Sequence, residues 1–166
     1  MSIINDFRLL LLGMWLGAAV FFSVVMAPAA FSVTRSFQLE NASEIAGGIV
    51  TRTLSIVNTS GFVVSILLML SAFAFRKSFA SWTTILELVM LGVVALTTGV
   101  GQWVIAAKMH ALRAAAGGPI DQLAATDPTR VAFNTLHGYS VKALGVGMIA
   151  ALIAFFLVAY RARLNS

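Results

Sequence analysis

Long apolar segments, separated by short polar stretches, dominate this sequence. A helix that spans a bilayer takes about 20 predominantly apolar residues, and four segments reach that length. None of them alternates as a membrane β-strand does, and a helix satisfies its own backbone hydrogen bonds in lipid. The pattern therefore predicts an all-α integral membrane protein with a single domain over residues 1–166 and spans at about 9–33, 54–75, 82–107 and 141–160.

Helix start and stop signals lie outside the apolar spans. Residues 41–44 read Asn-Ala-Ser-Glu, a capping box that places the start of the second helix near Ala42. Ser81 suits the N-cap of the third helix, and the Gly-Gly-Pro of residues 117–119 is a stop signal for its end. The Thr-Asp-Pro of residues 126–128 then predicts a fourth helix that begins at its proline.

These boundaries make the second, third and fourth helices longer than the membrane is thick. Each extends past its span by roughly ten residues, or about 15 Å, and all three extensions lie on one side. The sequence thus predicts a four-helix bundle with a polar crown, meaning the helix ends that lie beyond the apolar spans on this side. The opposite side carries both chain termini and a short turn over residues 76–81.

The first segment has two interpretations. Arg8, the apolar run after it and the small residues of 26–30 resemble a signal peptide with a cleavage site. The run continues past that site through Phe31 and Val33, which favours a retained helix. Pro28 should bend or weaken this helix near its end, because proline lacks a donor and clashes with the carbonyl one turn back.

Composition and charge agree with a membrane location. Hydrophobic residues make up 60% of the chain and charged residues 10%, with a mean hydropathy of +0.95, whereas soluble domains carry about 25% charged residues. The net charge is +5, but the basic residues flank the spans, where they set topology and meet lipid headgroups. Nucleic acid binding is not expected. The absence of cysteine excludes disulfides, thiolate metal sites and a cysteine nucleophile.

The distribution of basic residues predicts the orientation. Basic residues close to the spans and in short loops count most, and they favour the cytoplasmic side. The clusters at residues 76–77 and 161–163 lie on the side of the termini. We therefore expect cytoplasmic termini and a periplasmic or external crown, in a bacterial inner membrane. Close helix packing is predicted at Gly13-x-x-x-Gly17 and Ala143-x-x-x-Gly147.

Both histidines lie on the crown side. His110 follows the third span and His137 precedes the fourth, and these two helices should be antiparallel neighbours. Two imidazoles could ligate a haem b iron axially, or bind copper or zinc with help from Met109. Trp103 lies seven residues before His110, on the same helical stripe, and could wall such a pocket. The alternative is that both histidines are interfacial hydrogen-bonding residues.

Two ionisable residues lie inside apolar runs. Such residues are costly in a membrane and usually face a cavity or a partner. Lys142 is a candidate for the cofactor site, with snorkelling to the interface as its alternative. Glu87 lies near the opposite end of the third helix, too far away to pair with Lys142. Arg113 is a candidate ligand for an anionic headgroup or a haem propionate, as are the other crown arginines, Arg35, Arg52 and Arg130.

Several of these motifs resemble an uncharacterised four-helix membrane family, typified by transmembrane protein two-hundred-and-five. The resemblance covers nearly the whole chain and implies a four-helix domain with no established reaction. It rests on Trp15-Leu16-Gly17 with Phe21, Ala27-Pro28-x-x-Phe31, Ala46-Gly47, Lys108-Met109-His110-x-Leu112-Arg113 and Leu136-His137-Gly138-x-Ser140.

The plan is more distantly similar to copper-resistance-type membrane proteins and to the haem-binding protoporphyrinogen oxidase of bacteria. Both place histidines near helix ends. The first helix here has no histidine, so only His110 and His137 could carry a comparable role.

No phosphate-binding loop, nucleophile elbow or pair of inward carboxylates is present in the sequence. We therefore expect a binding or accessory protein, such as a subunit or assembly factor that meets other membrane subunits or a second copy of itself in the lipid bilayer. The alternatives are a haem or metal protein that uses His110 and His137, which as an enzyme would be a haem-dependent oxidoreductase, and a small transporter or metal-homeostasis factor.

Overall fold

The protein folds into four long helical rods. The computed structural model describes residues 3–38, 41–75 and 82–164. The elements in chain order are α1 (Ile3–Phe21), η1 (Phe22–Met26), α2 (Ala27–Ser36), α3 (Ala42–Phe75), α4 (Trp82–Gly99), η2 (Val100–Ile105), α5 (Ala106–Ala116), η3 (Ile120–Gln122) and α6 (Pro128–Leu164).

Each rod is long and apolar enough to cross a membrane. The four candidate spans are Ile3–Ser36, Ala42–Ala74, Trp82–Ala116 and Pro128–Arg163. No strand occurs within the described ranges. The prediction of an all-α four-helix membrane bundle is thus confirmed, and the chain is an integral membrane protein.

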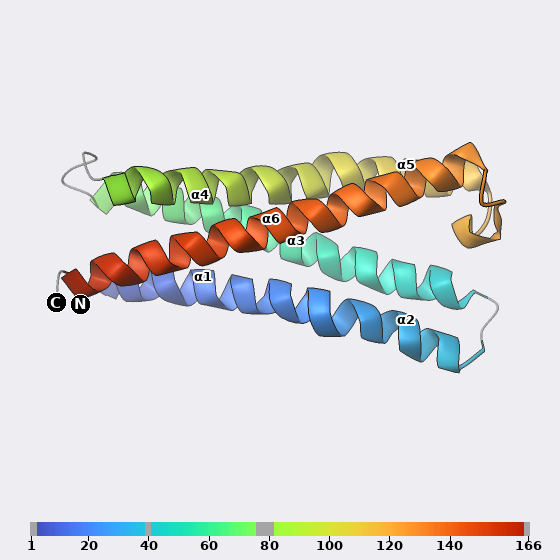
Figure 1. Cartoon of the computed structure of the whole chain (residues 1–166), viewed down its shortest axis with the longest axis horizontal. Helices are drawn as coiled ribbons and strands as arrows, with labels where there is room; N and C mark the ends of the chain where they lie inside the picture. The colour runs from blue at the N-terminus through green and yellow to red at the C-terminus, as the bar shows by residue number, and fades with distance from the viewer. Residues whose placement is uncertain (1–2, 39–40, 76–81, 165–166) are drawn as a thin grey trace.

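The rods lie side by side along the long axis of the molecule (Figure 1). The chain termini and the ends of α3 and α4 lie at one end, and α2, α5 and η3 lie at the other. This second end is the predicted crown. The first rod also continues into it as far as Ser36, beyond the predicted limit at residue 33, so the crown contains the ends of all four rods.

Local sequence signals set the described helix ends in the crown. Helix α3 begins at Ala42, and α5 ends before Gly117, whose φ of 65° is left-handed and suits glycine. Helix α6 begins at Pro128, where Asp127 Oδ1 accepts a hydrogen bond of 2.7 Å from the backbone N–H of Thr129. These predictions are confirmed. The turn over residues 76–81, with the proposed cap Ser81, lies outside the described residues.

Two rods contain a π-helical segment, where the turn is wider than in an α-helix. Segment η1 directly precedes the turn that holds Pro28, and a wider turn relieves the clash of a proline ring with the carbonyl one turn back. Segment η2 includes Gly101. The expected weakness near Pro28 is therefore present as a local widening of an otherwise continuous rod.

Helices α1 and α3 pack closely at Trp15 of α1. Its indole Nε1 donates a 2.9 Å hydrogen bond to the Val57 carbonyl of α3. A Cβ on Gly61 would lie 2.5 Å from the same indole nitrogen, so glycine is needed there. By contrast, a Cβ on Gly17 would have no heavy atom within 4 Å among the described residues. Gly17 is exposed, whereas a Cβ on Gly13 would lie 3.6 Å from the Phe155 ring of α6, so within the described residues the predicted Gly13-x-x-x-Gly17 motif meets another helix at Gly13 and not at Gly17.

A buried ion cluster joins three helices near the termini. Glu87 of α4 is completely buried and pairs with both Arg8 of α1 and Arg161 of α6. Arg161 also donates a 3.0 Å hydrogen bond to Thr84 Oγ1. Arg8 is only 3% exposed. The sequence predicts only topology and headgroup contacts for the basic residues that flank the spans. The structure gives two of them, Arg8 and Arg161, an acidic partner in the core.

Replacing Glu87 with glutamine should destabilise the bundle strongly. The variant keeps the shape of the side chain but removes the buried negative charge that pairs with Arg8 and Arg161, and breaking a buried ion pair typically costs about 3–5 kcal/mol. Unfolding in detergent with increasing denaturing surfactant measures the loss. The matched variant Glu44→Gln, at an exposed acid of the crown, should unfold as the wild type does. Equal stability of the Glu87 variant and the wild type would show that this ion cluster does not stabilise the bundle.

Candidate binding site at the crown

The rods separate toward the crown. Near the termini α1 packs on α6, whereas in the crown half α2 packs on α3. Figure 1 shows the rod formed by α1 and α2 diverging from α6 in this direction. Three cavities, each lined by residues that the structure describes, open in this half of the molecule.

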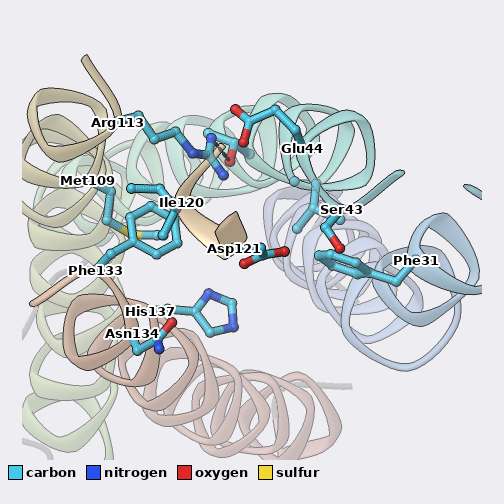
Figure 2. Close-up of a pocket in the computed structure, with 13 residues that line it drawn as sticks. Phe31, Ser43, Glu44, Met109, Arg113, Ile120, Asp121, Phe133, Asn134 and His137 are labelled. Carbon is cyan, nitrogen blue, oxygen red and sulfur yellow. Dashed lines mark hydrogen bonds between the residues drawn. The ribbon is translucent and has the colours of Figure 1, made fainter. Parts of the chain in front are cut away.

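The first is a polar cavity of about 180 Å³ within the crown. Figure 2 shows Arg113 and His137 on opposite sides of it, with Asp121 pointing in between. Its charged lining residues are Glu44 of α3, Arg113 of α5 and Asp121 of η3. The crown cavity thus offers both positive and negative groups to water on this side of the bundle.

Arg113 is held in the crown cavity by weak contacts. Its Nη1 donates a 3.3 Å hydrogen bond to Thr51 Oγ1, and its guanidinium carbon lies 5.1 Å from the centroid of the Phe133 ring. A Cβ on Gly47 would come within 2.8 Å of Nη2, so this glycine makes room for the guanidinium. The buried Nε of Arg113 has no hydrogen-bond partner in the described part of the chain. With five N–H donors, Arg113 keeps donors that the described contacts do not use, and its binding of a ligand stays a prediction.

The other crown arginines have different surroundings. Arg130 donates hydrogen bonds to the backbone carbonyls of Leu123, at 2.6 Å, and Asp121, at 3.2 Å, and so fastens the connection between α5 and α6. Arg35 and Arg52 are exposed. These three therefore do not face the crown cavity.

The second cavity, here called the inner pocket, has a volume of about 110 Å³ and lies next to the first. Both histidines and Met109 line it, so the structure brings His110 and His137 to one place. The two imidazoles themselves are exposed. The rest of its lining includes neutral polar side chains from three rods, namely Thr51, Ser55 and Asn58 of α3, Gln102 of η2 and Ser140 of α6.

The geometry does not support the haem or metal hypothesis. Among the described residues, no group of three or more His, Cys, Asp or Glu side chains is arranged to hold a metal ion. The pocket that the two histidines share is about 110 Å³, smaller than typical cofactor sites of ~300–1,000 Å³. Ligation of haem b or copper by His110, His137 and Met109 stays a prediction.

The third cavity, here called the lateral cleft, is apolar and has a volume of about 420 Å³. It lies between the first rod and α6, with the floor formed by α3. Its polar lining residues are Ser23, His137 and Ser140, and most of the remaining lining is apolar, with residues such as Phe22, Leu54, Leu144 and Met148. Val50 and His137 line all three cavities, so the polar and apolar compartments adjoin at these two residues.

Trp103 does not wall the site, which corrects its prediction. It is 54% exposed on the outside of the bundle, where its ring meets Phe62 edge to face at 4.8 Å. The prediction assumed a constant period of 3.6 residues between Trp103 and His110. Segment η2 has wider turns, which shift the register and bring Gln102 to the interior instead.

Lys142 also lies outside the three cavities. It is exposed on α6, and its Nζ is 6.0 Å from the centroid of the Tyr139 ring. This position agrees with the snorkelling alternative, because the aromatic ring and the lipid interface both suit a long cationic side chain. Lys142 is therefore not placed to bind a ligand with the histidines.

Sequence reasoning missed the neutral residues of the inner pocket. Thr51, Ser55 and Asn58 follow each other at spacings of four and three, which places them on one face of α3. This polar stripe enters an apolar span and is the signal that could have revealed the pocket. Gln102 had no such signal, because its orientation depends on the π-helical register.

Fold and site together define an integral membrane protein of four helices with a polar cavity that adjoins an apolar cleft. Comparison with family models gives a match to the domain of unknown function DUF4149 over residues 10–117. This is more than half of the chain, and the protein belongs to that family. No curated protein and no solved structure matches the chain. The comparison does not extend to the transmembrane protein two-hundred-and-five or copper-resistance families, so those resemblances stay predictions.

The outward position of Trp103 can be measured by quenching with brominated lipids. In the double variant Trp15→Phe/Trp82→Phe, Trp103 is the sole tryptophan and faces lipid. We expect strong quenching of its fluorescence by lipids brominated along the acyl chain. With Trp82→Phe/Trp103→Phe, the remaining Trp15 is only 4% exposed and should be quenched weakly. Quenching of Trp103 as weak as that of Trp15 would show that Trp103 is enclosed.

Proposed function

We propose that this protein binds an amphipathic molecule taken from the bilayer. The observation that carries the proposal is that Val50 and His137 border the polar crown cavity, the inner pocket and the lateral cleft alike. An amphiphile needs such an arrangement, because its polar end must reach hydrogen-bonding groups while its tail stays in apolar surroundings.

The polarity of the cleft supports this proposal. Along α6 the lining changes from His137 and the hydroxyl group of Ser140 to the apolar side chains of Leu144 and Met148. Its volume of about 420 Å³ falls within the range of small-molecule sites. In a membrane, such a cleft is filled by lipid or by a lipid-like ligand, and the graded lining favours a molecule with one polar end.

Binding of an amphiphile is a more specific form of the role expected from the sequence, that of a binding or accessory protein. It requires no reaction, and it leaves room for partners, whether other membrane subunits or a second copy of the chain. The haem and transporter hypotheses gain no specific support from the three cavities.

A leucine at position 145 should empty the cleft of its ligand. Gly145 lines the cleft, and a Cβ there has no heavy atom within 4 Å among the described residues, so the larger side chain enters open space. We expect the wild type to retain about one amphiphile per chain after mild delipidation, and Gly145→Leu to retain much less. Mass spectrometry of the extracted lipids measures the difference.

The control makes the same exchange elsewhere in the bundle. Gly92 of α4 also has open space around its Cβ and lines none of the three cavities. Gly92→Leu should retain the amphiphile at the level of the wild type. Equal retention in the Gly145 variant and the wild type would overturn the proposed function.

The proposed orientation has cytoplasmic termini and an external crown, in a bacterial inner membrane. It can be tested directly, because the chain has no cysteine that would react in the background. A membrane-impermeant maleimide should label Asp121→Cys in intact cells, since Asp121 is exposed in the crown. Asp6→Cys, exposed near the N-terminus, should react only after the membrane is disrupted. The reverse pattern would invert the orientation.

A further inference from the structure

The inner pocket contains polar groups at the depth of the apolar spans. Asn58 lies in the second predicted span and Gln102 in the third. Polar side chains without partners are costly in such surroundings, and those that occur there commonly serve a function. Each hydrogen-bonding atom of these two side chains is therefore expected to have a partner.

The amide groups of these two residues are not fully used. Gln102 Nε2 donates a 2.9 Å hydrogen bond to Ser55 Oγ, but its buried Oε1 has no partner in the described part of the chain. Asn58 is 4% exposed, and its side chain forms no hydrogen bond with any described residue. Both residues line the inner pocket. A free acceptor and a free amide thus face one enclosed space.

Close packing holds both amides in place. A Cβ on Gly101 would lie 3.1 Å from Asn58 Nδ2, so the amide of Asn58 rests against the backbone of η2. The same π-helical segment carries Gln102, and π-helical segments are frequent at functional sites. The two amides are therefore presented to the pocket in a fixed arrangement.

We infer that the inner pocket binds an uncharged head with carbonyl or hydroxyl oxygens, as in a membrane quinone or quinol. This inference rests on the proposed function, because the tail of the same molecule occupies the lateral cleft. The two cavities adjoin along Val50, Leu54, His137 and Ser140. Carbonyl oxygens accept hydrogen bonds from the Asn58 amide and the Ser140 hydroxyl, and a ring hydroxyl donates to Gln102 Oε1.

An uncharged head fits better than a charged one. Among the described residues, no aspartate or glutamate lines the inner pocket, and its ionisable lining residues are Arg113, His110 and His137. A phosphate at the depth of Asn58 and Gln102 would lose its hydration among neutral amides. An anionic headgroup finds its complement in the crown cavity, beside Arg113. The small volume of the inner pocket also favours a compact ring over a bulky headgroup.

The test measures binding of a benzoquinone with a single decyl tail, kept in its reduced quinol form, to the detergent-purified full chain. Only this form of the quinone carries ring hydroxyls that can donate to Gln102 Oε1. Asn58→Leu keeps the approximate size of the side chain and removes its amide, and Gln102→Met does the same on another rod. Each should weaken binding about fivefold to tenfold, the effect of one lost hydrogen bond. Titration calorimetry measures the affinity. The two variants lie on different helices, so misfolding of one leaves the other informative.

Two controls test whether contacts with the polar head of the ligand cause the loss of affinity. Gln122 of η3 is exposed and lines none of the three cavities, so Gln122→Met should bind the quinone as the wild type does. Decylbenzene has the same tail and a ring without oxygens. It should bind the wild type more weakly than the quinone, with an affinity that Asn58→Leu does not change.

The outcomes separate this inference from the proposed function. Unchanged quinone affinity in both Asn58→Leu and Gln102→Met would overturn the quinone head, even if Gly145→Leu abolished binding of other amphiphiles. Selective binding of an anionic single-chain amphiphile, lost in Arg113→Gln, would also overturn it and move the head to the crown cavity. Loss of quinone binding in Asn58→Leu, Gln102→Met and Gly145→Leu alike would support both the quinone head in the inner pocket and the proposed function.

Discussion

The buried carboxylate of Glu87 is the constraint on which the arrangement of the helices depends. Placed in the core of a membrane bundle, it needs cationic partners, and Arg8 and Arg161 supply them from two other rods. The cluster draws α1, α4 and α6 together near the termini. At the opposite end α2 follows α3 instead of α6, and the space between the first rod and α6 widens into the lateral cleft. The ion cluster thus lies at the end where the helices pack closely, and the lateral cleft lies at the end where they separate.

The two π-helical segments shape this open end. Segment η1 contributes Phe22 and Ser23 to the lateral cleft, and η2 contributes Gln102 to the inner pocket. A wider turn changes which residues face inward after it without breaking the rod. In the first rod the cause is local, since Pro28 cannot fit a regular α-helix at that point. In the third rod glycine at position 101 allows the backbone to lie against Asn58. Both segments therefore place polar groups beside cavities.

The site that results is graded in polarity from water to lipid. Charged groups, among them Arg113, lie in the crown cavity, neutral amides lie in the inner pocket, and apolar side chains lie in the cleft. His137 borders all three compartments. In this member of the DUF4149 family, the gradient is the basis of the proposed binding of an amphiphile.

The sequence by itself determined the features that depend on near neighbours in the chain. Span lengths, the start of α6 at Pro128 and the stop before Gly117 follow from hydropathy and from local backbone chemistry, so they could be predicted. The shared pocket of the histidines was also within reach, because antiparallel neighbours bring matching depths together. The partners of Glu87 and the inward position of Gln102 could be found only in the folded structure. Both depend on contacts between distant segments and on a helical register that a fixed period of 3.6 residues does not describe.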